Sequence, residues 1–171
     1  RANKLACGTV STGEHLAATQ FASAAGIDLK HVAYEASPMG DLAAGRIDLY
    51  VGTIGQGLAD SRKGRARLLA TMTAERTRLT PSAPCLAEEN VAVPAAGLER
   101  VMLLAPAKTP SDVVARLARE VQAALGDKAV RTELERTSLV PGASSPGQLA
   151  REIEEARKTW AQFAREAGLS K

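Results

Sequence analysis

The sequence predicts an α/β fold with a mostly parallel sheet in the first half of the chain, followed by helices alone. Two observations carry this prediction. Up to about residue 71, short apolar runs alternate with segments of helical character, as they do in βαβ units. From residue 109 onward, apolar residues recur only at helical intervals.

The elements of the first half follow from this alternation. Four apolar runs are predicted strands: Leu5 to Cys7, Lys30 to Tyr34, Asp48 to Val51 and Leu68 to Thr71. Three segments between them are predicted helices: Glu14 to Ala25, Pro38 to Ala44 and roughly Gln56 to Arg62. Gly26, Gly45 and Gly64 follow these helices, where a left-handed residue commonly ends a helix.

The second half begins with a loop-rich stretch, Thr77 to Pro94, and a predicted short strand, Val101 to Ala105. Three helices follow. Thr109-Pro110-Ser111-Asp112 supplies a cap with proline at the first helical position, and Gly126 ends that helix. Asp127 is the expected cap of the second. Ser145-Pro146-Gly147-Gln148 is a capping box for the third helix, in which the Gln148 side chain can reach the Ser145 amide. Gly168 ends this helix.

These helices carry apolar stripes that need a surface to cover them. The first stripe consists of Val113, Leu117, Val121 and Leu125. The second consists of Leu149, Ile153, Ala156, Trp160, Phe163 and Ala167. An apolar stripe is normally buried against another element, yet only one predicted strand comes shortly before these helices. We therefore expect the sheet that covers them to be missing from this chain or to come from another one.

Composition narrows the classes of partner. Hydrophobic residues make up 45% and charged residues 24%, as in soluble globular proteins. The net charge of +3 arises from 22 basic and 19 acidic residues that are mixed along the chain, and aromatic residues are only 3%. The run Arg62, Lys63, Arg65 and Arg67 is typical of a solvated loop. The sequence therefore predicts no nucleic-acid partner, and no run approaches the roughly 18 apolar residues of a membrane span.

One segment has the chemistry of an anion site. Residues 7 to 16, CGTVSTGEHL, run from a predicted strand into a predicted helix. Small residues leave backbone amides accessible there, hydroxyls add donors, and the helix N-terminus carries partial positive charge. Capping of the helix for stability alone is the alternative interpretation. The segment is not a nucleotide-binding P-loop, because no Lys-Ser/Thr pair follows the glycines.

An enzyme remains an alternative at this stage, with Cys7 and His15 as its only plausible centre. A cysteine near a helix N-terminus can have a lowered pKa, but no third, orienting group can be named. His15 and His31 have no metal-ligand partner at suitable spacing, so we predict neither metal nor cofactor. Cys7 and Cys85 are either free thiols or one disulfide.

Together the motifs resemble a known family. The pattern runs from the Gly/Ser/Thr-rich turn through His31-Val32-Ala33-Tyr34 and residues 41 to 48, DLAAGRID. It continues with residues 76 to 79, RTRL, residues 84 to 88, PCLAE, and residues 104 to 110, LAPAKTP, and it ends at Trp160 and Ala167-Gly168-Leu169. This order resembles the C-terminal portion of the substrate-binding proteins of the tripartite tricarboxylate transporters, also called Bug or TctC-like proteins.

The resemblance implies a periplasmic-binding-protein-like (type II) lobe, with the helices of an incomplete first lobe. Residues 1–98 would form the second α/β lobe. Residues 99–171 would be the returning strand and C-terminal helices of the first lobe, whose N-terminal part is absent. In this family two lobes close over a small, usually carboxylated solute.

The resemblance also implies the ligand-binding residues, which lie in three loops. The first loop, which binds a ligand carboxylate in the family, contributes Gly8, Thr9, Ser11, Thr12 and Gly13. The second contributes Tyr34, Glu35, Ala36 and Ser37, and the third contributes Gly52 and Thr53. Glu35 stands where the family has a basic residue, so we expect it to disfavour polyanionic ligands.

The implied function is that of a periplasmic solute-binding protein, or a fragment of one, that captures a small carboxylate without covalent chemistry. Its partners would be the carboxylate and, indirectly, the membrane subunits of a tripartite transporter. Two alternatives stay open. One is a truncated or degenerate scaffold that self-associates without binding ligand, for example as a homodimer through the C-terminal helices. The other is the Cys/His-dependent enzyme.

Overall fold

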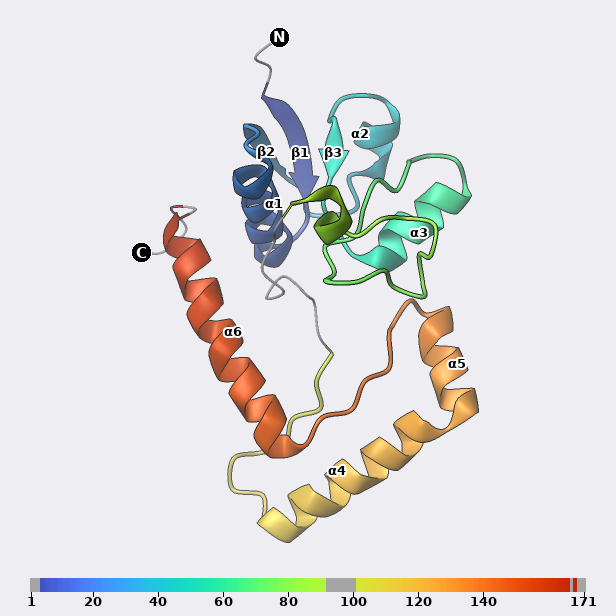
Figure 1. The fold of residues 1–171 in the computed structure, drawn as a ribbon, viewed down its shortest axis with the longest axis vertical. Helices are drawn as coiled ribbons and strands as arrows, with labels where there is room; N and C mark the ends of the chain where they lie inside the picture. Colours follow the sequence, from blue (N-terminus) through green and yellow to red (C-terminus); the bar gives the residue numbers. More distant parts are fainter. Residues whose placement is uncertain (1–3, 92–100, 167, 169–171) are drawn as a thin grey trace. The chain divides into compact units, whose positions relative to one another are not determined.

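The computed structural model describes residues 4–91, 101–166 and 168. The chain divides into two compact units (Figure 1). Unit 1 comprises Arg1–Glu99 together with Ala161–Lys171, and unit 2 comprises Arg100–Trp160. The α/β part and the all-helical part that the sequence predicts correspond largely to these two units.

Unit 1 is organised around a parallel sheet. Within the described residues the sheet has the strands β1 (Leu5–Thr9), β2 (Leu29–Ala33) and β3 (Leu49–Tyr50), in the order β2-β1-β3. The central residue Cys7 pairs with His31 on one side and with Leu49 on the other. The predicted parallel sheet is thus confirmed, with β1 at its centre.

The helices of unit 1 begin and end close to where the sequence places them. They are α1 (Thr12–Ala25), α2 (Met39–Ala43) and α3 (Ile54–Arg62). Gly26, Gly45 and Gly64 have φ angles of 64°, 68° and 67°, so each adopts the left-handed conformation predicted for it. These three residues fix where the chain leaves each helix and returns to the sheet or loop.

The two faces of the sheet are covered by different elements. Cys7, on one face of β1, lines a pocket together with residues of α1. Gly8, on the opposite face, lies under Pro38 and Ile47, which flank α2. Figure 1 shows α1 beside β1 and β2. The unit therefore has the layered arrangement of a doubly wound α/β fold, with helices on both sides of the sheet.

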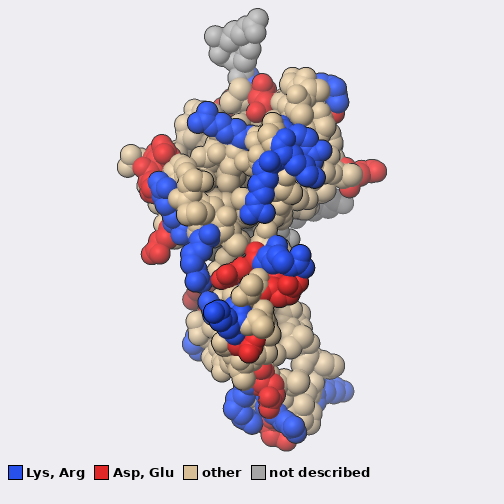
Figure 2. Space-filling view, turned by 90° about the vertical axis from the view of Figure 1, so that its right-hand side faces the viewer, with Lys and Arg blue, Asp and Glu red and all other residues tan. Residues whose placement is uncertain are grey.

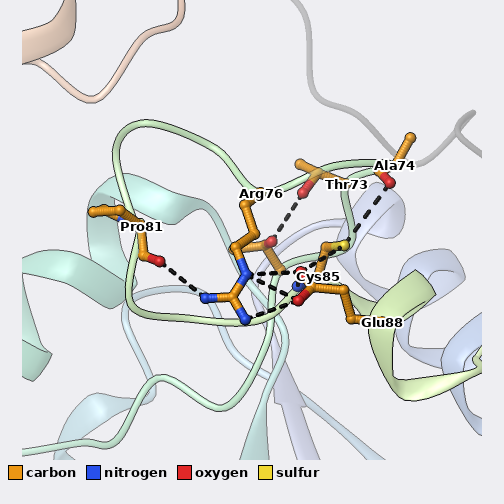
Figure 3. A network of polar contacts seen from close by, with 7 residues as sticks. Thr73, Ala74, Arg76, Pro81, Cys85 and Glu88 are labelled. Carbon is orange, nitrogen blue, oxygen red and sulfur yellow. Dashed lines mark hydrogen bonds and ion pairs between the residues drawn. The ribbon is translucent and has the colours of Figure 1, made fainter.

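The predicted strand Leu68 to Thr71 does not form. Only Thr71 makes a bridge, to Cys85, ahead of the 3₁₀ helix η1 (Leu86–Glu89). The intervening loop is instead held by side chains (Figure 3). Arg76 donates from Nε and Nη2 to the Glu88 carboxylate at 2.8–2.9 Å and from Nη1 to the Pro81 carbonyl at 3.0 Å.

Glu88 also serves the start of η1. Its Oε1 accepts from the Cys85 amide at 3.1 Å and lies 3.2 Å from the Cys85 thiol. The carboxylate therefore joins the loop at residue 76 to the first turn of η1. Hydrogen bonds from Arg76 and from Cys85 lower the pKa of Glu88 from 4.5 to about 2.

Unit 2 is helical in its described residues. It contains α4 (Ser111–Gly126), α5 (Lys128–Arg136) and the first part of α6 (Pro146–Glu166). Asp127 caps α5 as predicted, accepting from the Ala129 and Val130 amides. The N-cap of α4 is Pro110, without a side-chain cap bond, so the proline lies one position earlier than predicted.

The capping box predicted for α6 forms only in part. The Ser145 hydroxyl accepts from the Gln148 amide at 3.2 Å, as expected. The Gln148 side chain donates to Glu152 at 3.0 Å instead of returning to Ser145. A carboxylate one helical turn ahead competes successfully with the backbone for this amide group.

The predicted strand Val101 to Ala105 is not formed in the described structure of this chain. Val101, Leu103 and Leu104 are 81%, 69% and 72% exposed, and no strand pairing involves them within the described residues. An apolar run becomes a strand only where a neighbouring strand supplies hydrogen-bond partners. The described part of unit 2 contains no neighbouring strand that could supply such partners.

The surface carries mixed charge. On the face drawn in Figure 2, Lys and Arg side chains are interspersed with Asp and Glu side chains. No described helix combines the length and the apolar character needed to cross a membrane.

Candidate ligand-binding site

The candidate site lies where the parallel strands of unit 1 end. β1, β2 and β3 are each followed by a loop and then by the N-terminus of a helix, α1, α2 and α3 respectively. The strand order β2-β1-β3 means that the chain leaves β1 toward one side and later returns to its other side. In α/β sheets of this kind, ligands bind outside the carboxyl ends of the strands at such a switch point.

The first loop ends in a well-defined helix cap. Ser11 is the N-cap of α1, and its hydroxyl accepts from the Glu14 amide at 3.2 Å. The Glu14 carboxylate in turn accepts from the Val10 amide at 2.6 Å. Ser11, Thr12 and Gly13 are exposed, and no described residue accepts a hydrogen bond from the amides of Thr12 and Gly13. These two amides and the helix dipole are available to an anion.

Gly8 and Thr9 are placed differently from the rest of this loop. A Cβ atom on Gly8 would lie 2.7 Å from Ile47 Cδ1, 3.1 Å from Pro38 Cβ and 3.2 Å from Tyr34 Cε2. Thr9 is only 2% exposed, and its hydroxyl lies 2.6 Å from His31 Nε2. Both residues are therefore packed inside unit 1, and their predicted contact with a ligand stays a prediction.

The second loop is anchored by Tyr34. Its amide donates to the Thr9 carbonyl at 2.9 Å, and its hydroxyl donates to Asp41 at 2.8 Å. Arg46 donates to the same carboxylate, and this hydrogen bond lowers the pKa of Asp41. The hydrogen bond to Asp41 raises the pKa of the Tyr34 phenol. Tyr34 thus holds the loop to α2, while Glu35, Ala36 and Ser37 are exposed.

The third loop is ordered by Thr53 and Tyr50. Thr53 is the N-cap of α3, and its hydroxyl accepts from the Gln56 amide at 3.4 Å. The Tyr50 hydroxyl donates to the Gln56 side chain, and the Tyr50 ring occupies the space that a Cβ on Gly52 would need. Tyr50 was not among the site residues predicted from the sequence. Its position at the carboxyl end of β3 was the signal that could have identified it.

The Cys7–His15 centre lacks the properties of an activated nucleophile. Cys7 is 1% exposed, and burial raises the pKa of its thiol, which disfavours the thiolate that such a mechanism requires. The His15 ring stacks on His31 at a centroid distance of 3.5 Å. Cys7 and Cys85 are both free thiols, and the described residues contain no group of three side chains suited to a metal ion.

Similar solved structures define the class of protein. The fold of an R. palustris protein, Rpa4515, solved with adipate, matches with a TM-score of 0.78 at 29% identity, over 98% of this chain and 57% of that one. A TctC solute-binding protein from Polaromonas matches with a TM-score of 0.75 at 18% identity, over 96% of this chain and 58% of that one, which shows the fold alone. The chain has the fold of a periplasmic solute-binding protein.

The family follows from the sequence match. Residues 1–169 match the receptor of the tripartite tricarboxylate transporter family, TctC. The chain belongs to this family of substrate-binding receptors, as its motifs suggested.

Curated relatives agree with this assignment. A UPF0065 protein encoded between tcbD and tcbE in Pseudomonas sp. strain P51 is 29% identical over 88% of this chain and 46% of its own length. A UPF0065 protein encoded between clcB and clcD in Pseudomonas knackmussii is also 29% identical, over 81% of this chain and 80% of its own length. The chain thus spans about half the length of the first relative and of the solved structures.

Proposed function

We propose that this chain is part of an extracytoplasmic, periplasmic solute-binding protein that captures a small carboxylate for a tripartite transporter. The observation that carries the proposal is the accessible N-terminus of α1 at the carboxyl edge of the sheet, in a chain of the receptor family. Backbone amides and hydroxyls at this helix end can hold a carboxylate without a metal or a bound cation.

The class of ligand is supported by one neighbour. The R. palustris protein, 29% identical over nearly the whole chain, was solved with adipate, a dicarboxylate. In this chain Arg46 is already paired with Asp41, Arg65 with Asp60 and Arg76 with Glu88. Recognition of the carboxylate by helix-terminal amides is therefore better supported than recognition by these arginines.

The division into lobes belongs to the same proposal. Residues 1–98 correspond to the second lobe, and residues 99–171 correspond to the returning segment and helices of the first lobe. The exposed apolar segment at residues 101 to 104 is consistent with a segment that pairs with strands of a first-lobe sheet. The membrane subunits of the transporter are the proposed indirect partner of the complete receptor.

The proposal is tested by calorimetry with adipate and, as a matched neutral control, adipamide. We expect adipate to bind and the diamide not to bind, because only the former supplies a carboxylate to the α1 amides. Mass spectrometry of small molecules released from the denatured protein provides an independent test. A protein that binds neither adipate nor any acid of a broader panel, and that releases none, contradicts the proposal.

A second candidate is a scaffold that self-associates without binding a ligand. The specific observation in its favour is the exposure of apolar side chains in unit 2, where neither α4 nor α5 has a buried residue. The occupant would be a second copy of the chain, which presents the same helices. Light scattering distinguishes this candidate, because a self-associated chain has a mass well above 17.9 kDa.

A further inference from the structure

Two imidazoles join α1 to the edge strand β2. His15 lies in the first turn of α1, four residues after the N-cap, and His31 lies at the middle of β2. Their rings are stacked, with centroids 3.5 Å apart and an interplanar angle of 4°. His31 is also tied to β1, because its Nε2 lies 2.6 Å from the Thr9 hydroxyl.

The stack is unsuited to metal binding. The lone pair of an imidazole nitrogen lies in the plane of its ring, so two parallel rings cannot both direct lone pairs at one ion between them. The described residues also contain no group of three ligating side chains around the pair. The stacked geometry is instead compatible with two imidazoles of which at most one is protonated and positively charged.

We propose that the His15–His31 stack is an acid-sensitive clamp that holds the first turn of α1 on the sheet and releases it when both imidazoles are protonated. Protonation of both rings would place two positive charges about one ring thickness apart, in surroundings less polar than water. Ring contact across the α1–β2 junction would then become repulsive. The clamp itself does not depend on the proposed function, whereas its effect on ligand binding does.

The surrounding groups do not neutralise a second charge. From β1, Cys7 faces the same pocket, and burial raises the pKa of its thiol, so it contributes no thiolate. Asp28, just before β2, also lines the pocket, but it is paired with Lys4 at 3.2 Å. On α1, Glu14 keeps its negative charge while its carboxylate accepts from the Val10 amide, so it can balance at most one of the two positive charges.

The direction of the pH effect follows from His31. Burial, and then the charge of His15, lower the pKa of His31 below its ordinary value of 6.5. The unfolded chain therefore binds more protons than the folded one just below pH 6.5. The stabilisation is complete above that pH and is lost as the pH falls through the lowered pKa. A pocket of about 280 Å³ that both histidines line gives water a route to the rings.

Release of the first turn would disturb the candidate ligand loop. His15 follows Glu14 directly, and the His15 amide donates to the Ser11 carbonyl at 3.0 Å. The exposed residues Ser11, Thr12 and Gly13 belong to the same turn. A looser turn presents its amides less regularly, so acidification should weaken the capture of an anion.

The decisive measurement is hydrogen exchange of the His15 and Leu16 amides, expressed as protection factors at about pH 7.5 and about pH 5.5. In the unmodified protein we expect the protection factors of these two amides to fall about tenfold on acidification, relative to that of the Ile153 amide of α6. The matched variant His15→Phe keeps an aromatic ring and the Thr9–His31 contact but cannot carry a second charge. In this variant the protection factors of the same amides should fall less than about threefold on acidification. An equal loss in both proteins overturns the proposal.

Two further measurements keep the proposal falsifiable if the variant folds poorly. The ring protons of His31 in the unmodified protein should titrate by NMR at a lower pH than those of an unperturbed histidine, because its pKa is lowered. A His31 titration near pH 6.5 overturns the clamp. Adipate affinity should fall more steeply with acid in the unmodified protein than in His15→Phe. If no adipate binds at any pH, the proposed function fails, while the exchange result still decides the clamp.

Discussion

The side chain of Gln20 is a buried polar group in the core of unit 1, where it is expected to reduce stability. It lies on α1 among buried apolar neighbours, and its side chain is 7% exposed. Within the described part of the chain, neither its Oε1 nor its Nε2 has a hydrogen-bond partner. A buried amide group without partners keeps its full desolvation cost. Gln20 is therefore a residue at which an apolar replacement should be favourable.

We expect Gln20→Leu to raise the free energy of unfolding by about 1 kcal/mol, because leucine has a similar volume and no polar atoms to satisfy. Urea unfolding monitored by circular dichroism measures this change. Gln148→Leu, on the exposed start of α6, is the matched control and should change little. Destabilisation by Gln20→Leu would indicate that the amide has a partner in solution, such as ordered water.

Ser11 has two predicted roles, as the cap of α1 and as part of the carboxylate site. Ser11→Ala should lower the free energy of unfolding by about 1 kcal/mol through loss of the cap. It should also weaken adipate binding, and Ser11→Ala with Thr12→Ala should weaken it by about 1–3 kcal/mol. Ser145→Ala removes the corresponding cap of α6 and should affect stability alone. Unchanged affinity in the double variant would remove this loop from the site.

Local signals were sufficient to predict the helix cap at Ser11 but not the packing of Gly8. The family resemblance implied both residues as ligand contacts, and these contacts stay predictions. For Gly8, however, the close approach is made by Ile47, Pro38 and Tyr34 of the same chain. Whether a ligand or a side chain fills the space above a glycine depends on residues 26 or more positions away, which local spacing does not determine.

At the scale of elements, the helices were predicted close to their observed bounds, whereas two of the predicted strands do not form. A helix is closed by hydrogen bonds within itself, so caps such as Asp127 and left-handed glycines such as Gly26 mark its ends in the sequence. A strand needs a neighbour. Residues 68–71 and 101–105 have suitable composition, but only Thr71 finds a bridging partner in the described structure. The long-range pairs His15–His31 and Arg76–Glu88 were unpredictable for the same reason.

The loop held by Arg76 and Glu88 should make the stability of unit 1 depend on acid. Because the pKa of Glu88 is lowered to about 2, the stabilisation from its carboxylate is complete above about pH 4.5. It is lost as the pH falls from there toward about 2. We expect the thermal midpoint of the unmodified protein to fall across this window, and Glu88→Gln to reduce the slope.

Glu154→Gln is the control for this measurement. Glu154 pairs with Arg157 on the exposed surface of α6, and its pKa is lowered mainly by the hydrogen bond from Arg157, with a smaller contribution from the charge of Lys158. Glu88, by contrast, also accepts from the Cys85 amide and lies against the Cys85 thiol. The Glu88 variant should therefore change the acid slope more than the Glu154 variant. The Glu88 variant should also speed alkylation of the buried Cys85 thiol. Equal acid slopes in the Glu88 and Glu154 variants would contradict a special role for the contacts of Glu88 with Arg76 and Cys85.

At the scale of the whole molecule, the described helices of unit 2 have apolar side chains that are partly exposed. Val113 and Leu117 of α4 are 42% and 45% exposed, Val130 of α5 is 37% exposed, and Ile153 of α6 is 40% exposed. The stripes that the sequence predicted to need a covering sheet are thus incompletely buried in the described chain. Burying one such side chain fully is worth about 1.5–3 kcal/mol relative to leaving it exposed. Several together amount to a large part of the stability of a small domain.

We therefore predict that this chain self-associates at micromolar concentration through α4 and its neighbouring helices. A two-fold symmetric pair would let each copy cover the stripe of the other. Static light scattering should give a mass near twice 17.9 kDa. Leu117→Lys should shift the equilibrium toward monomer by tenfold or more in Kd, since about 1.4 kcal/mol corresponds to each factor of ten.

The matched control is Leu69→Lys, which places the same charge on an exposed leucine of unit 1. It should leave the mass unchanged, because Leu69, at 58% exposure, is even more accessible than Leu117 but lies outside the apolar helices. Dye binding separates the remaining outcomes. A soluble monomer that binds a hydrophobic dye has uncovered stripes, and the prediction of a dimer is then wrong. A monomer that binds no dye shows that α4, α5 and α6 fold back onto the chain itself in solution, which would contradict both the predicted dimer and the need for a covering sheet.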